Sequence, residues 1–183
     1  MTQVASSRGQ ELANRLQETT SELAAFVESL TPQEWAMRGN NAPEWQLGED
    51  EKRPVGTIAF HAAAIIGMPH VPLVRDAAEG RPLDPVQGWS VEAVAEGNAD
   101  FAEQHADVTK PQVLGLLNSN TATALDLIRG LTEEQLQRGI GISDQQALLQ
   151  WCGEARTVDR LIEQLLIGHI LLHRSSLRAT VGR

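Results

Sequence analysis

Two histidines, His169 and His173, lie four residues apart in a run of leucine and isoleucine near the end of the 183-residue chain. On an α-helix this spacing places both imidazole rings on one face, one turn apart, where they can reach a common metal ion. Burying two neighbouring imidazoles is costly unless both are satisfied, and a metal ion satisfies both at once. Because the chain has five histidines, a chance pair of unrelated core histidines remains an alternative.

His61 is the third candidate ligand, because it lies between Ile58 and Ile65 on the apolar face of an expected helix. In helical bundles, metal sites are formed by inward side chains of facing helices. Three neutral histidines from two helices make a three-nitrogen face that leaves one or more positions for water or substrate. We therefore predict a metal site formed by His61, His169 and His173.

The other two histidines are not predicted to be ligands. His70 follows Met68-Pro69 at a break in the apolar pattern, so we expect it in a loop. His105 lies near the C-terminal end of an expected helix, where a partly charged imidazole suits the helix dipole.

Three further polar residues on the expected helices have two interpretations each. Asn120 is either a buried, hydrogen-bonded amide or a residue that orients a metal ligand. Arg174 and Arg178 have either a functional role or a structural one, as part of a solvated face or in pairs with acidic neighbours. We favour the structural interpretation for all three.

The elements that must position the histidines are helical, because apolar residues recur at spacings of three and four and no segment alternates with the period of a strand. The sequences SLTPQEW and GLTEEQL each follow a long amphipathic helix and resemble a tight turn into a short capped helix. The predicted fold is an all-α four-helix bundle with short accessory helices, formed as one domain by residues 1–183. The predicted helices cover residues 6–29, 31–35, 54–66, 72–79, 90–106, 109–130, 131–136, 143–151 and 154–179.

Two segments raise separate questions. Residues 38–53 are polar and rich in turn formers, so they predict a long loop, with Trp45 as its anchor to the core. Residues 165–172 are apolar almost all round, which predicts burial on most sides by the same domain or by a second subunit.

Composition limits the partners and the location. The net charge is -9 and the sequence pI is about 5.0. Such an acidic surface repels phosphate backbones and anionic lipid, so we expect no nucleic-acid and no membrane partner. The N-terminus does not resemble a signal peptide, and no apolar stretch approaches the roughly 20 residues that cross a bilayer. We therefore expect a cytoplasmic protein.

The single cysteine, Cys152, excludes an intrachain disulfide and is expected to be a buried apolar residue rather than a nucleophile.

From about residue 8 to 180, the chain resembles the DinB/YfiT-like superfamily of metalloenzymes, which are four-helix bundles. The resemblance rests on PVGTIAFHAA around His61, on LIEQLLIGHILLHRSSL with the pair His169 and His173, and on the two turns SLTPQEW and GLTEEQL. One departure is Trp45, which precedes His61 by sixteen residues, whereas relatives commonly carry a tryptophan about eight residues before the first histidine.

The resemblance implies a divalent transition metal, nickel or zinc, held by the three histidines. It also implies a low-molecular-weight thiol, because relatives include bacillithiol S-transferases and mycothiol-dependent maleylpyruvate isomerases, and it implies a homodimer. The expected function is an enzyme in which the metal activates a thiol or water for S-transfer or hydrolysis of a small-molecule substrate. No residue is predicted to be the general base. The alternatives are a non-catalytic metal-binding or helical dimerisation module, and a chain that has lost its metal.

Overall fold

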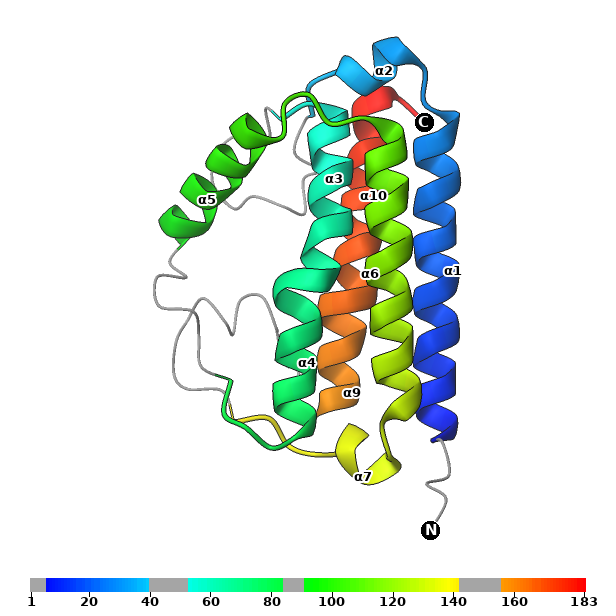
Figure 1. Cartoon of the computed structure of the whole chain (residues 1–183), viewed down its shortest axis with the longest axis vertical. Helices are drawn as coiled ribbons and strands as arrows, with labels where there is room; N and C mark the ends of the chain where they lie inside the picture. Colours follow the sequence, from blue (N-terminus) through cyan, green and yellow to red (C-terminus); the bar gives the residue numbers. More distant parts are fainter. Residues whose placement is uncertain (1–5, 40–52, 84–90, 142–155) are drawn as a thin grey trace.

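A computed structural model of the chain describes residues 6–39, 53–83, 91–141 and 156–183, and of residues 91–96 and 99 it describes the backbone alone. Within these ranges the structure contains helices and two isolated β-bridges, but no strand. Four helical columns lie side by side, which confirms the predicted four-helix bundle (Figure 1). The columns are α1 (Ser7–Ser29), α3 (Val55–Ile65) with η2 (Ile66–His70) and α4 (Val71–Ala78), α6 (Lys110–Gly130), and α9 (Val158–Leu161) with η3 (Ile162–Gly168) and α10 (His169–Val181).

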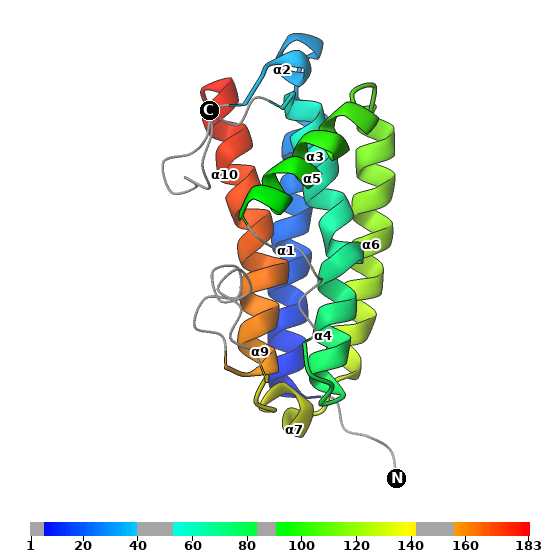
Figure 2. The same ribbon diagram turned by 90° about the vertical axis from the view of Figure 1, so that its left-hand side faces the viewer.

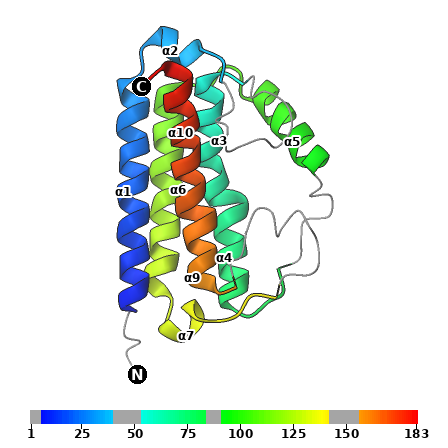
Figure 3. The same cartoon turned by 180° about the vertical axis from the view of Figure 1, so that it is seen from behind.

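The columns do not simply alternate in direction. The column of α1 and the column of α9, η3 and α10 run one way, whereas the column of α3, η2 and α4 and the column of α6 run the other way (Figure 1 and Figure 3). The chain must therefore return along the bundle between α4 and α6. Helix α5 (Val91–Gln104) belongs to this return and lies outside the four columns, next to α3 (Figure 2).

Two short capped helices close opposite ends of the bundle, α2 (Pro32–Ala36) and α7 (Glu133–Leu136) (Figure 1). In α2, the Thr31 hydroxyl accepts from the Glu34 N–H and the Glu34 carboxylate accepts from the Thr31 N–H. Thr132 and Gln135 form the same reciprocal pair in α7. These capping boxes confirm the prediction that SLTPQEW and GLTEEQL share one local design.

The column of α3, η2 and α4 has a kink where the sequence predicts a break. Met68 has non-helical dihedral angles (φ -143°, ψ 120°), and the next residue, Pro69, has no N–H to donate. The turn before the kink gains an external partner, because Asn120 Nδ2 on α6 donates to the carbonyl oxygen of Ala63 at 2.9 Å. The hydrogen bond supports the structural interpretation of Asn120. The next helix was predicted to begin at residue 72, and α4 begins at Val71, immediately after the kink.

By length and composition, one helix of the described residues could span a membrane, Val55–Ala78 with its kink. The expectation that no apolar stretch of the sequence is long enough to cross a bilayer is therefore wrong. In the structure, 61% of the apolar window is buried, and its residues contact α6 and α10. Packing in the bundle accounts for the apolar character of this column.

The last column is largely buried where its sequence is most apolar, although Leu171 is 40% exposed. Leu165, Leu166, Ile167 and Ile170 are each at most 2% exposed, between α1, α3 and the kinked segment. The helices of the same chain bury these four side chains. The predicted helix at 143–151, Trp45 with most of the loop 38–53, and Cys152 lie outside the described residues.

Candidate metal centre

The structure brings together the three histidines that the sequence singles out. His61 comes from α3, and His169 and His173 come from α10, which packs against α3. One ring nitrogen of each histidine lies within 4.8 Å of the corresponding nitrogens of the other two. The Nε2 atoms of His169 and His173 are 2.7 Å apart, so both rings direct the same nitrogen toward one point. This convergence is the arrangement that three ligands of one ion require.

A change in helix type directly precedes the histidine pair. Residues Ile162–Gly168 form a π-helical segment, and α10 begins at His169. The wider turn of a π-helix shifts the following residues around the helix axis, and such segments occur frequently at functional sites. Consequently, the apolar residues before Gly168 and the histidines after it both face the interior of the bundle.

Burial keeps these imidazoles neutral. His169 is 4% exposed and His173 is 8% exposed, whereas the His61 side chain is partly exposed although its ligand nitrogen is buried. Loss of solvation lowers the pKa of His169 to about 4 and lowers the pKa of His61 and His173 well below the usual value. At neutral pH the three imidazoles are therefore uncharged, so a cation that binds here displaces no net positive charge from the rings.

A positive charge lies beside the three histidines. After burial, the guanidinium of Arg53 makes the largest contribution to the lowered pKa of His61 and His169, and it also lowers the pKa of His173. The backbone of Arg53 is fixed just before α3, because its carbonyl accepts from the Gly39 N–H at 2.9 Å. Arg53 thus places a positive charge near the three histidines. This role could not be predicted from the sequence, since Arg53 lies in a polar segment without periodicity.

Helix α5 contributes an aromatic wall on the side of His61. The ring of Phe101 meets His61 edge-on with centroids 5.5 Å apart, and Phe101 stacks on His105 at 4.2 Å. Phe60 lies 4.7 Å from His105 on the same wall. His105 Nδ1 is 2.8 Å from the carbonyl oxygen of Phe101, so this histidine takes part in the aromatic stack and is not one of the three grouped ligands.

His70 contradicts the prediction that it lies in a loop. It is the last residue of η2, it is 2% exposed, and its ring centroid is 4.9 Å from that of His169. The prediction failed because Pro69 was taken as the end of a helix, whereas α4 continues the column after a local kink. His70 is therefore a fourth buried imidazole beside the candidate centre.

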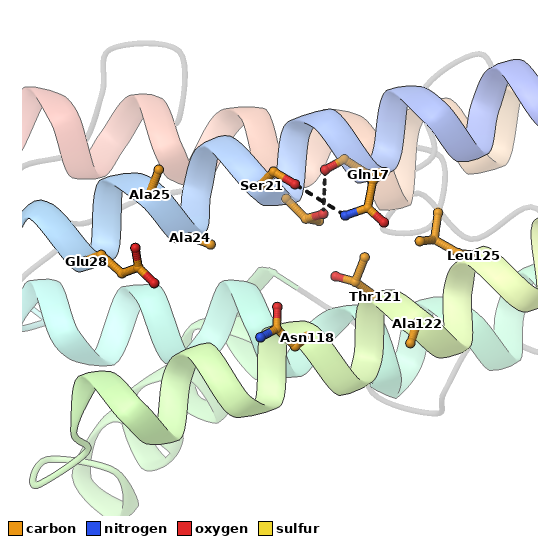
Figure 4. Close-up of a pocket in the computed structure, with 10 residues that line it drawn as sticks. Gln17, Ser21, Ala24, Ala25, Glu28, Asn118, Thr121, Ala122 and Leu125 are labelled. Atoms are coloured by element: carbon orange, nitrogen blue, oxygen red, sulfur yellow. Dashed lines mark hydrogen bonds between the residues drawn. The ribbon is translucent and has the colours of Figure 1, made fainter.

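The remaining expectations concern residues away from the three histidines. Arg174 forms an ion pair with Glu22 of α1, which supports its structural interpretation. A pocket of about 360 Å³ lies between α1 and α6 (Figure 4). Small and polar side chains line it, among them Gln17 and Ser21, which are hydrogen-bonded at 3.3 Å. No histidine lines this pocket, so it is separate from the candidate centre.

Comparison with solved structures shows that several proteins share this four-helix fold. YfiT from Bacillus subtilis, described as a probable metal-dependent hydrolase with an unusual four-helix bundle topology, is 18% identical with a TM-score of 0.62, covering 100% of this chain and 92% of that chain. The colibactin self-resistance protein ClbS, in complex with double-stranded DNA, is 17% identical with a TM-score of 0.62, covering 94% of both chains. DfsB, a sibling lethal factor precursor, is 20% identical with a TM-score of 0.59, covering 95% of both chains.

These likenesses show the fold, and they confirm the predicted resemblance at that level. No protein-family profile and no curated protein sequence matches the chain.

The expectation that acidic composition excludes nucleic acid is wrong. ClbS has the same fold and forms a complex with double-stranded DNA, so a bundle of this type is compatible with such a partner. The physical reason is that net charge sums over the whole chain, whereas contact with a phosphate backbone depends on the charges of one face. A value of -9 for the chain therefore does not decide the question.

Proposed function

We propose that this chain is a metal-dependent enzyme in which His61, His169 and His173 hold one divalent transition metal, nickel or zinc. The convergence of three imidazole nitrogens within 4.8 Å of one another carries the proposal. Imidazole is a ligand that suits both metals, and the depressed pKa values keep these imidazoles uncharged at neutral pH. The description of YfiT as a probable metal-dependent hydrolase supports the same class of function.

Such a metal, when bound, lowers the pKa of a water or thiol beside it and polarises a substrate. The three protein ligands leave at least one position open, which favours chemistry over a purely structural site. The partial exposure of the His61 side chain provides a side from which a ligand can enter. We propose S-transfer from a low-molecular-weight thiol or hydrolysis as the reaction.

The residues around the three histidines suggest how a substrate is held. Arg53 supplies a positive charge that favours an anionic group next to the metal. Phe101 supplies aromatic surface against His61, and Phe60 stacks on Phe101. Among the described residues, no Asp or Glu belongs to the cluster of ligand nitrogens, so we assign no general base.

The test is the metal content of tag-free protein, measured by elemental mass spectrometry for the wild type and for the double variant His169→Ala/His173→Ala. We expect close to one equivalent of a transition metal in the wild type and none in the double variant. His105→Ala is the matched control, because it removes a histidine that lies in the aromatic stack outside the cluster. No metal in the wild type, even after incubation with nickel or zinc, would exclude the proposed function.

A further inference from the structure

His70 lies next to the candidate metal centre and has no assigned role. Its ring centroid is 4.9 Å from His169, which is closer than the 6.1 Å between His61 and His169. The His70 and His169 rings are inclined at 64°, in an edge-to-face contact. By position, His70 therefore belongs to the same group of imidazoles as the three candidate ligands.

The hydrogen bonding of His70 is incomplete. The side chain is 2% exposed, and its Nδ1 atom is buried without a hydrogen-bond partner among the described residues. A backbone hydrogen bond with Leu165 acts on the His70 ring and opposes the lowering of its pKa, but Nδ1 itself has no partner. Buried polar atoms in native structures are almost always satisfied, and an exception at a functional site indicates a group that is absent.

His70 does not complete the set of ligand nitrogens directly. The group of nitrogens within 4.8 Å of one another consists of His61, His169 and His173, and His70 is outside it. A ring nitrogen outside this group, on a ring in edge-to-face contact with His169, is suited to a molecule bound at the metal rather than to the metal itself. Outer residues of this kind commonly orient what the metal binds.

We infer that His70 is a fourth functional imidazole of the site, whose Nδ1 forms a hydrogen bond with the exogenous ligand that binds beside His61, His169 and His173. That ligand is a small polar molecule, such as water or the thiol of the proposed reaction. His70 is a positioning residue, and it acts in this way only if the proposed metal site exists.

The experiment compares wild type, His70→Phe and His70→Asn in the cobalt(II)-loaded protein. Phenylalanine keeps a ring of similar size and removes both nitrogens, whereas asparagine keeps a polar atom at the position of Nδ1. Visible absorption measures the affinity for cobalt(II) and then, by titration, the affinity for azide, which displaces the ligand at the open position. Circular dichroism checks the fold of each variant, and His70→Leu replaces His70→Phe if the latter does not fold.

We expect all variants to bind one cobalt(II) with affinity within about threefold of wild type, because the three ligands remain. We expect azide affinity to change about fivefold in His70→Phe, the effect of one hydrogen bond, and to return toward wild type in His70→Asn. Tighter azide binding means that Nδ1 accepts a hydrogen bond from the displaced molecule, and weaker binding means that Nδ1 donates to azide. Either change supports the inference.

Equal azide affinity in the three proteins would overturn the role of His70 and leave the metal site intact. A loss of cobalt(II) affinity of more than about a hundredfold in His70→Phe would also overturn it, because His70 would then be a direct ligand. Absence of cobalt(II) binding by the wild type refutes the proposed function instead, so the two failures are distinguishable.

Discussion

Desolvation of His169 has a consequence for stability that can be worked out from its pKa. In the unfolded chain His169 titrates near the usual value of 6.5, whereas in the folded, metal-free protein burial lowers its pKa to about 4. Above pH 6.5 both states are neutral at this residue, and the folded state has its full stability. As the pH falls below 6.5, the unfolded state binds a proton that the folded state does not bind, so the free energy of unfolding decreases until about pH 4.

The size of the effect follows from the shift. A difference between 6.5 and about 4, at about 1.4 kcal/mol for each pH unit, corresponds to a loss of about 3 kcal/mol from His169 alone. Most of this loss falls above pH 4.5, where the carboxylates of Glu34 and Glu163, whose pKa values are lowered to about 2, do not yet contribute. The interval from pH 6.5 to 4.5 therefore isolates the histidines.

Urea unfolding of tag-free protein, freed of metal with a chelator, provides the assay at a series of pH values from 7.5 to 4.5. We compare the wild type with His169→Gln, which removes the titrating group and keeps a polar side chain of similar length. The stability of the wild type is expected to fall more steeply with decreasing pH than that of the variant. Parallel curves for the two proteins would show that His169 is not desolvated as the structure indicates.

Two further predictions concern the surroundings of the histidines. Replacing Arg53 by Gln removes a positive charge from the site and should tighten metal binding about tenfold, measured by competition with a chelating dye. Arg174→Gln is the matched control, because Arg174 pairs with Glu22 on α1. An equal effect of both substitutions would contradict a local role of Arg53. A Cβ at Gly67 would lie 2.7 Å from Oδ1 of Asn120, so Gly67→Ala should lower the free energy of unfolding by about 1–3 kcal/mol. In an Asn120→Ala background the same change should cost much less, and additive costs in a double-mutant cycle would refute this contact.

Helix positions and the three grouped histidines could be predicted from the sequence because local patterns determine them. Thr31 and Thr132 mark helix starts by their own hydrogen bonds, and the structure contains both caps. The spacing of His169 and His173 fixes their common face once the segment is helical. His61 could be added because its helix has one continuous apolar face, which must point into the bundle.

The other residues near the site could not be found in this way, because tertiary packing brings them there. Arg53 reaches the histidines only through the path of the chain before α3, and Phe101 only through the return segment that carries α5. The prediction placed His70 in a loop because a proline such as Pro69 interrupts the helical pattern both in a loop and in a kinked helix. Only the packing of α4 directly after the kink decides between the two.

The energetics of the bundle also bear on why these imidazoles are present. His61, His70, His169 and His173 all have pKa values lowered primarily by burial, so each makes the metal-free fold less stable below pH 6.5 than an apolar side chain would. Leucine and isoleucine fill the adjoining core positions without this cost. Packing alone therefore does not account for four histidines in contact, and local departures of this kind from a well-packed core are characteristic of functional sites. A cation bound by three of them would offset the desolvation that the fold imposes, which ties the stability of the bundle to the occupancy of its proposed metal site.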